Sequence, residues 1–313
     1  MKNIIFDGMS HIQDLRYGEN PHQKASWYGH KNSGLSDARL LQGKELSYNN
    51  LIDLEAAILT VKEFECTACV VIKHTNPCGV AFGKTVFEAT KTALDCDRTS
   101  AFGGIIASNV AIDKPTAIEL SKDFYECIVA PAFDSDALAV FKTKKNLRIL
   151  ELDIKNITFS DVNVRSILGG ILVQEKDNQT TDPSEWKVVT KAKPTVEQFT
   201  DLIFAWNVCK HVHSNAIVLV ENMKTVGIGA GQTNRIGSAE IAFANLNGKS
   251  LGNSTVLASD GFFPFDDIVN SAHSNSIKAL IQPGGSLKDQ ESIDTCDRLG
   301  MSMVFTNKRH FLH

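Results

Sequence analysis

A lysine and a histidine stand side by side where a buried strand is predicted to end, and together they are suited to proton transfer. Residues 70–72 are three consecutive β-branched residues, which favour a strand. Lys73 and His74 follow, and Asn76-Pro77 predicts a turn directly after them. Ligands of open α/β sheets bind outside the carboxyl ends of strands. An ammonium and an imidazole there can give and take a proton at one reacting centre. The alternative is a strand end with two polar residues before a turn, and these residues alone do not decide.

The rest of the chain predicts strands that alternate with helices, which indicates an α/β fold with helices on the faces of a sheet. Pro115 is placed to open a helix, and Thr195 with Gln198 forms a capping box at the start of another. Helices are expected at residues 51–64, 195–210 and 236–246, and strands at 126–131, 147–152, 167–173, 216–220, 225–228, 255–259, 279–283 and 302–305.

The chain divides into two parts that echo one another. Residues 175–193 are polar and charged, which is typical of a linker or a surface excursion. On each side a Lys-His pair is followed by an asparagine, as Lys73-His74 with Asn76 and as Lys210-His211 with Asn215. We therefore expect two related α/β units, residues 1–185 and 186–313.

Composition excludes several classes of protein. The chain has 313 residues, of which 43% are hydrophobic and 22% charged, as in a folded domain. Its net charge of -4 gives no basic surface for nucleic acid. No apolar run approaches the ~20 residues of a membrane-spanning helix, and an aspartate soon after the N-terminus argues against a signal peptide. Seven scattered cysteines argue against a disulfide framework, so we expect a cytoplasmic protein with reduced thiols.

Three further motifs were tested for chemistry. Cys66 and Cys69 form a C-x-x-C without a second pair at zinc-finger spacing, which favours two core thiols over a metal or redox site. The glycines at 227–231 fail the dinucleotide fingerprint, which needs G-x-G-x-x-G. Arg16 and Tyr17 lie in a polar stretch that is either a phosphate-gripping loop or a solvated one.

Taken in order, several segments closely resemble the transformylase domain of the bifunctional purine biosynthesis proteins. The domain is 5-aminoimidazole-4-carboxamide ribonucleotide (AICAR) formyltransferase. The resemblance rests on LRYGENPHQ (15–23), KELSYNNLIDLEAA (44–57), VVIKHTNPCG (70–79), FAWNVCKHVHSNAIVLV (204–220), GIGAGQTNRI (227–236), SDGFFPFDD (259–267) and TNKRHFLH (306–313).

The resemblance implies an enzyme that transfers the formyl group of 10-formyltetrahydrofolate, its co-substrate, to the 5-amino group of AICAR. It also implies two cytidine-deaminase-like three-layer α/β units in tandem, and a homodimer whose active sites draw residues from both subunits. No nucleic-acid or membrane partner is implied. Some members of the family use potassium, and the sequence leaves open a structural potassium ion here.

The family motifs imply roles for individual residues, each carried over by its place in a matching segment. Lys73 and His74 match the catalytic pair. Asn215 and Arg235 match residues that the other subunit contributes to the carboxamide end. The remaining matches are Arg16, Tyr17, Arg309 and His313 at nucleotide-binding positions, with the arginines near the phosphate, Gly103 and Glu126 near the ribose, and Phe262, Pro264 and Asp267 at nucleotide- and folate-contacting positions.

The bifunctional members also have an N-terminal IMP cyclohydrolase domain, which these residues do not contain. Because the chain begins with Met1, we expect a monofunctional transformylase rather than a fragment. Two other functions were weighed. A zinc nucleobase deaminase needs H-x-E and P-C-x-x-C, and the chain has no H-x-E and no second cysteine after Pro77-Cys78. A non-catalytic nucleotide- or folate-binding homologue would be expected to lack residues such as Lys73, His74, Asn215 or Arg235, all of which are present.

Overall fold

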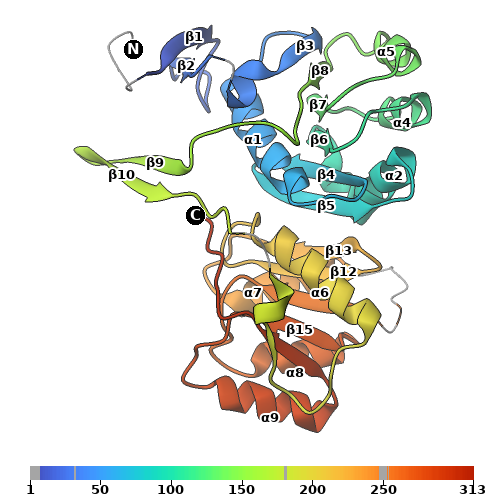
Figure 1. Ribbon diagram of the computed structural model, residues 1–313, viewed down its shortest axis with the longest axis vertical. Coiled ribbons are helices and arrows are strands. Elements are labelled where there is room, and N and C mark those ends of the chain that lie inside the picture. The colour runs from blue at the N-terminus through green and yellow to red at the C-terminus, as the bar shows by residue number, and fades with distance from the viewer. Residues whose placement is uncertain (1–7, 32, 180–181, 247–251, 253) are drawn as a thin grey trace.

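A mixed sheet of twelve strands runs through both halves of the described chain in a computed structural model (Figure 1). The structure describes residues 8–31, 33–179, 182–246, 252 and 254–313. The strand order is β11-β16-β15-β14-β12-β13-β5-β4-β6-β7-β8-β3, so that β5 and β13 meet in the middle. The expected α/β class with helices and a sheet is confirmed.

The first half of the sheet contains the strands β3 to β8. Its strands are β3 (Arg39–Gln42), β4 (Ala68–Lys73), β5 (Asn76–Phe82), β6 (Ile105–Ser108), β7 (Cys127–Ala130) and β8 (Arg148–Glu151). Its helices are α1 (Tyr48–Lys62), α2 (Val86–Cys96), α3 (Arg98–Ala101), α4 (Lys114–Leu120) and α5 (Ser135–Phe141).

The second half contains the strands β11 to β16. Its strands are β11 (Lys187–Val188), β12 (Ile217–Glu221), β13 (Lys224–Gly229), β14 (Val256–Ser259), β15 (Ala279–Gln282) and β16 (Ser302–Phe305). Its helices are α6 (Val196–Cys209), α7 (Arg235–Ala244), α8 (Asp267–Ser274) and α9 (Asp289–Leu299).

The two halves repeat one order of elements. In each half a helix, α1 or α6, leads into an antiparallel hairpin, β4–β5 or β12–β13. A helix follows, and then three mutually parallel strands, β6–β8 or β14–β16. The first of these parallel strands runs antiparallel to the neighbouring hairpin strand in both halves. The repeat therefore places the β4–β5 turn and the β12–β13 turn at equivalent positions.

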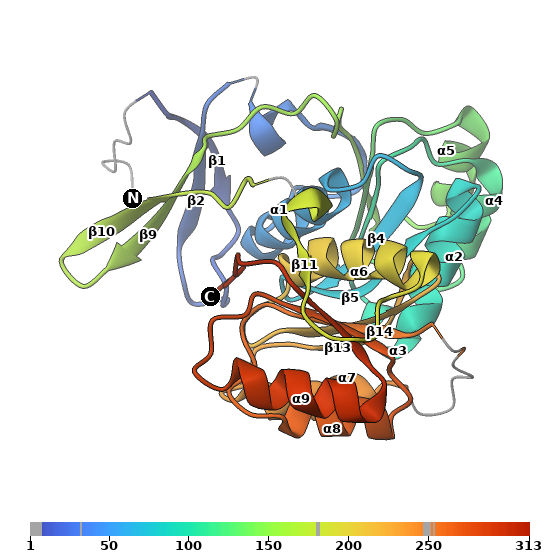
Figure 2. The same cartoon turned by 60° about the horizontal axis from the view of Figure 1, so that its bottom comes forward.

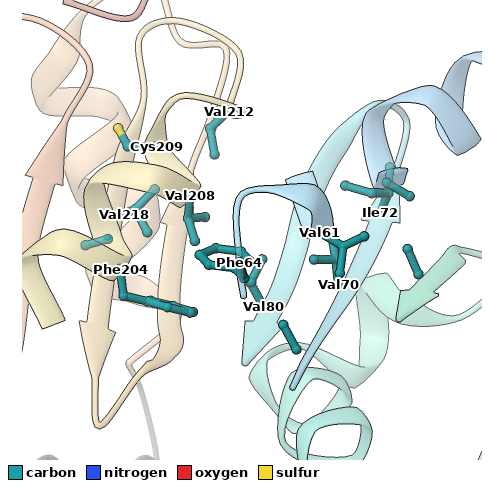
Figure 3. Packing of buried hydrophobic residues seen from close by; sticks show 14 of the residues in the cluster. Val61, Phe64, Val70, Ile72, Val80, Phe204, Val208, Cys209, Val212 and Val218 are labelled. Carbon is teal, nitrogen blue, oxygen red and sulfur yellow. The ribbon is translucent and has the colours of Figure 1, made fainter. Parts of the chain in front are cut away.

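Helices cover both faces of the sheet. Alternate residues of β4 point to opposite faces, since Val70 belongs to one core cluster and Val71 to another. On one face α1 and α6 share a core that spans both halves, and Figure 3 shows Phe64 beside Phe204 there. Their rings are stacked with centroids 5.2 Å apart. On the other face, α2, α4 and α5 cover the first half and α7, α8 and α9 cover the second.

Local sequence explains where the main helices begin. Ser47 accepts a hydrogen bond from the Asn50 amide at the start of α1. Thr195 and Gln198 form the predicted capping box of α6, and Pro115 lies in the first turn of α4 as expected. These contacts satisfy amides that have no partner within the helix, which fixes the starting points of the helices that flank the sheet.

Three sequence-based expectations were wrong in detail. The turn predicted at Asn76-Pro77 lies two residues earlier, at His74 and Thr75, because both of those residues adopt positive φ and Asn76 already pairs with Lys73. The single strand expected at residues 167–173 is instead the hairpin of β9 (Val162–Ile167) and β10 (Gly170–Glu175). The polar excursion at 175–193 contains β11, which pairs with β16 at the edge of the sheet.

Two small hairpins lie apart from the large sheet. One consists of β1 (Ser10–Leu15) and β2 (Ala25–Gly29), and the other of β9 and β10. Figures 1 and 2 show β9–β10 extending away from the twelve-stranded sheet. The short helices η1 (Gly34–Asp37) and η2 (Pro183–Glu185) lie in connecting segments.

Within the described residues, no helix combines the length and apolar character needed to cross a membrane.

Candidate active site

Lys73 is the last residue of β4, so it lies where this interior strand of the sheet ends. Nζ donates a hydrogen bond to the Phe102 carbonyl at 2.6 Å. Gly103 follows with φ +70°, and a Cβ added there would lie 3.1 Å from Nζ. Only glycine combines this backbone conformation with room for the lysine. Lys73 and Gly103, which the resemblance assigned to the same site, are therefore in contact.

His74 and Thr75 form the turn between β4 and β5, called the first turn below. The His74 side chain is exposed, and the Thr75 amide donates to the Asp53 carboxylate of α1 at 2.7 Å. Burial raises the pKa of Asp53, and this effect is partly offset by the Thr75 amide and by the charges of His74 and Lys73. A hydrogen bond to the Asp53 carboxylate therefore holds the turn that contains His74 and directly follows Lys73.

Glu126 precedes β7 and lies on the same side of the first half as Lys73. Its amide donates to the Gly104 carbonyl at 3.0 Å, and its carboxylate accepts from Arg148 Nη1 at 2.8 Å. Arg148 also donates from Nε to the Glu45 carbonyl. The bond from Arg148 orients the Glu126 carboxylate, which remains partly exposed to solvent.

Lys73, Gly103 and Glu126 all lie next to strand ends of the first half, but not all of these are carboxyl ends as expected. Lys73 lies at the carboxyl end of β4, whereas Gly103 and Glu126 precede the amino ends of β6 and β7. The reason is that β4 runs antiparallel to β6. The rule that ligands bind outside the carboxyl ends of strands therefore fits Lys73 but not Gly103 or Glu126.

Asn215 lies at a pocket in the second half. The pocket has a volume of about 300 Å³ and is lined by Ser214, Asn215, Gly231, Gln232, Thr233, Phe311 and His313. Asn215 Nδ2 donates to the Gln232 carbonyl at 2.7 Å. The Ser214 amide donates to the Leu312 carbonyl at 2.8 Å, which fastens the C-terminal segment beside the pocket. The Ser214–Asn215 peptide bond is cis.

Arg235 is the first residue of α7 and is linked to the pocket residue Ser214 through Asp260. Its guanidinium pairs with Asp260 and donates to Ser259 Oγ at 3.0 Å. The Asp260 side chain is fully buried and the Arg235 side chain is 8% exposed. Asp260 also accepts a hydrogen bond from the Ser214 hydroxyl. Arg235 is therefore the counter-ion of a buried carboxylate, a role that the sequence did not predict.

The C-terminal segment adds aromatic and cationic groups. The Arg309 guanidinium lies 4.6 Å from the centroid of the Phe311 ring, and the rings of Phe311 and His313 are 5.9 Å apart. Gly261 packs so closely that a Cβ there would lie 2.8 Å from Phe311. The structure thus brings His313 and Asn215 to one pocket and places Arg309 next to it.

Other predicted residues lie outside the lining of that pocket. Arg16 lies 5.6 Å from the ring centroid of Tyr17, in the loop after β1. Asp267 begins α8, where its carboxylate accepts from the Ile268 amide. Phe262 and Pro264 are exposed in the segment between β14 and α8. Their assigned roles stay predictions.

The two clusters are connected through the first turn. Thr75 Oγ1 and His213 Nε2 are 3.0 Å apart, and the His213 amide donates to Asn76 Oδ1 at 3.0 Å. His213 is two residues before Asn215. The Lys73–His74 pair and the Asn215 pocket are therefore linked within one chain.

Sequence reasoning missed the residues that support the site. They are Asp53, Thr75, Arg148, His213 and Asp260. Asp260 gave one usable signal, since an acid directly after a buried strand needs a partner. The others pair across long sequence separations, which no local pattern reveals.

The described part of the chain shows no group of three or more His, Cys, Asp or Glu side chains arranged to bind a metal ion. Cys66 is exposed, whereas Cys69 is buried and has its thiol pKa raised to about 12 by burial. A buried neutral thiol fits the expected structural role.

Comparisons with known proteins agree on one family. The model of the AICARFT/IMPCHase bienzyme family matches residues 2–245. The chain is 56% identical over 312 residues to the bifunctional purine biosynthesis protein PurH of Prochlorococcus marinus strain MIT 9211, and 52% identical over 313 residues to PurH of strain MIT 9515. Each match covers 96% of this chain and 60% of the relative, so the chain spans about 60% of the length of these curated relatives.

Among solved structures, Acinetobacter baumannii RibD, form 2, aligns over 31% of this chain and 32% of that chain, with 17% identity and a TM-score of 0.22. This likeness is too weak to support an argument.

Proposed function

The chain belongs to the AICARFT/IMPCHase bienzyme family, and we propose that it is the AICAR formyltransferase of purine biosynthesis. It would transfer the formyl group of 10-formyltetrahydrofolate to the 5-amino group of AICAR, giving formyl-AICAR and tetrahydrofolate. The observation that supports this most is the Lys73–His74 pair, which stands on an outward turn and is connected through His213 to the Asn215 pocket.

The proposed chemistry begins with a weak nucleophile. The aromatic amine of AICAR attacks the formyl carbon and must lose a proton, which His74 would accept directly or through the carboxamide. Lys73 would stabilise the oxyanion of the tetrahedral intermediate and supply the proton that the departing folate nitrogen needs when the carbon–nitrogen bond breaks. Asn215, with Arg235 behind it, would hold the carboxamide in orientation.

The remaining roles concern binding of the nucleotide and the folate. Arg16 and Arg309 are exposed, and their guanidinium groups would bind the phosphate of the nucleotide. Tyr17, next to Arg16, and His313, near Arg309, would bind the nucleotide as well. Glu126 is oriented by Arg148 so that its carboxylate can accept from ribose hydroxyls, next to Gly103. Phe262 is proposed for the nucleotide, and Pro264 and Asp267 for the folate.

We further propose that residues 1–185 and 186–313 are two cytidine-deaminase-like units. The repeated order of helix, hairpin, helix and three parallel strands supports this. A cytoplasmic location fits a chain with seven free cysteines. A structural potassium ion stays an open part of the proposal, to be tested by replacing potassium with sodium in the assay.

A homodimer with shared active sites is also proposed. Both strands of the β9–β10 hairpin are exposed, and Val164, Ile171 and Val173 lie on one face of it. A two-stranded hairpin with such a face is marginal in water unless something packs on it. A second copy of the chain would provide that cover.

Sharing of the sites is tested by complementation. His74→Ala and Asn215→Ala each inactivate one part of the site, and Asn215 is preferred to Arg235 because removing Arg235 would leave the buried Asp260 unpaired. If sites are shared, co-expressed variants should regain about a quarter of wild-type activity, because random pairing makes half the dimers mixed and each has one intact site. Heterodimers confirmed by mass that stay inactive would show that each site lies within one chain.

The proposed function itself is tested by incubating the purified chain with AICAR and 10-formyltetrahydrofolate. Tetrahydrofolate is followed by absorbance and formyl-AICAR by chromatography, and we expect the two products in equal amounts. A folded chain that binds AICAR yet forms neither product would instead be a non-catalytic nucleotide-binding homologue.

A further inference from the structure

We propose that His213 is a positioning residue that holds the Lys73–His74 turn in its working conformation through the hydroxyl of Thr75. The inference rests on the proposed function for its kinetic consequence, although the positioning itself can be measured without turnover. Under this proposal His213 affects the reaction without contacting the reacting atoms. Among the residues that the structure describes, it also makes no contact with the proposed substrate-binding residues of the first half.

The first turn adopts a conformation that its own residues disfavour. His74 has φ 50° and Thr75 has φ 62°. Two-residue turns with positive φ at both positions normally use Asn-Gly or a similar pair. Threonine is β-branched, and positive φ is strongly disfavoured for such a residue. Contacts from outside the turn must therefore maintain this conformation.

Two segments supply these contacts. From α1, Asp53 accepts the Thr75 amide at 2.7 Å. From the segment after α6, His213 places Nε2 3.0 Å from Thr75 Oγ1, while the same hydroxyl donates to the His74 carbonyl at 2.6 Å. Since the hydroxyl has one proton and gives it to that carbonyl, Nε2–H of His213 is the donor to Oγ1. Burial and the nearby His313 charge lower the pKa of His213, so a neutral imidazole with its proton on Nε2 makes this contact.

The equivalent turn of the second half shows why an additional support is needed. That turn, called the second turn, consists of Asn222 and Met223 with φ 53° and 56°. Asp201 of α6 accepts both of its amides, at 2.8 and 2.7 Å. In the first turn Asp53 accepts the Thr75 amide, and the side chain of Thr75 is fixed by His213. Asp53 thus bonds one amide of the first turn where Asp201 bonds two of the second, and His213 adds a contact to the Thr75 side chain.

The backbone of His213 ties the same turn to the pocket. Its amide donates to Asn76 Oδ1 at 3.0 Å, and its carbonyl accepts from the Gly231 amide at 2.8 Å. Gly231 and Asn215 both line the pocket. A displacement of His213 would therefore move both the first turn and the edge of the pocket in the same chain.

The test uses His213→Leu, which removes the donor, and His213→Gln, whose amide can still donate to Thr75. We expect His213→Leu to lower kcat about tenfold with KM for AICAR within about twofold, because misplacement of a catalytic group costs rate rather than binding. His213→Gln should restore most of the rate. His211→Gln is the matched control, since His211 also bridges the halves but bonds to Glu63.

A double-mutant cycle separates positioning from general destabilisation. Thr75→Val should reproduce the kcat loss of His213→Leu, and the double variant should be no slower than the slower single variant. Losses that multiply in the double variant, or an equal kcat loss in His211→Gln, would overturn the proposal.

Hydrogen exchange tests the same contact without substrate. Exchange in peptides covering residues 70–79 should be faster in His213→Leu than in the wild type, and unchanged in His211→Gln, because the Thr75 amide loses part of its support. Unchanged exchange in His213→Leu would refute the positioning role. If the wild type showed no formyl transfer, the proposed function would fail while this result would still decide the role of His213.

Discussion

The first turn and the second turn are equivalent in architecture and different in use. Each joins two antiparallel strands, each has two residues with positive φ, and each is gripped by an aspartate from the preceding helix. The first turn presents His74 to solvent, beside Lys73. The second turn presents Asn222, and its Met223 packs against the core that the two halves share. Under the proposed function, the same scaffold would serve chemistry in the first half, whereas it serves packing in the second.

The difference lies in how much of each turn is committed to the core. The Met223 carbonyl accepts the Phe82 amide at 3.0 Å, and Met223 packs against the core that the two halves share. The Met223 side chain is therefore not available to a ligand. Asp201 is 2% exposed, whereas Asp53 is more accessible. The first turn is free to offer side chains to a ligand because polar contacts, rather than apolar packing, hold it.

The largest expected effect comes from removing the lysine beside each turn and comparing kcat. Lys73→Met should lower kcat on the order of 10²-fold, since removal of one oxyanion donor has a cost of that size. Lys224→Met, which follows the second turn, should leave kcat within about twofold. Steady-state kinetics on both variants check this, and circular dichroism confirms folding. Equal losses in the two variants would mean that Lys73 has no special part in the reaction.

Removal of the two aspartates should affect different properties. Asp201→Ala leaves two amides of the second turn without their partner and should lower the free energy of unfolding by about 2–3 kcal/mol. Asp53→Ala removes one amide contact and should cost about 1 kcal/mol while lowering kcat severalfold. Urea unfolding and kinetics measure both. The comparison fails if Asp201→Ala, once folded, loses as much kcat as Asp53→Ala.

The smallest expected effect concerns the junction of the halves. Glu63 at the end of α1 accepts from Lys210 and His211 at the end of α6, each at 2.9 Å. Burial opposes ionisation of Glu63, but the bonds and charges of His211 and Lys210 outweigh it and lower its pKa from 4.5. A lowered carboxyl pKa stabilises the fold above pH 4.5, and this stabilisation is lost as the pH falls through the lower folded-state value.

Glu63→Gln should therefore lower the free energy of unfolding by about 1–2 kcal/mol at pH 7. The difference from the wild type should shrink as the pH falls below 4.5. Chemical unfolding at a series of pH values measures it. A difference that is constant with pH would show that the charge of Glu63 does not stabilise the junction.

Local sequence was sufficient for several elements and for placing Lys73 at the end of a strand. The β-branched run before Lys73 predicted β4, and the capping box at Thr195 predicted the start of α6, because both signals lie within a few residues. The turn itself was misplaced. Asn76-Pro77 is an ordinary turn signal, whereas His74 and Thr75 are held at positive φ by Asp53 and His213, which are distant in sequence.

The same limit explains what was missed around Arg235. The helix after Arg235 was predicted at residues 236–246, but the buried pairing of Arg235 with Asp260 depends on β14 lying beside β12. Likewise, Gly103 lies beside Lys73 because β4 is antiparallel to β6, which strand propensities do not encode. Sheet order, rather than local pattern, decides which side chains share the site.

The most direct test of the account is a side-by-side measurement of formyl transfer by the wild type, His74→Ala and Asn222→Ala. These two variants remove the side chain at the first position of each turn, where both backbones have positive φ. The account predicts that His74→Ala binds AICAR within about tenfold of the wild type but loses a factor on the order of 10² or more in kcat, whereas Asn222→Ala keeps wild-type kcat. Normal turnover by His74→Ala would contradict the claim that the first turn performs the chemistry.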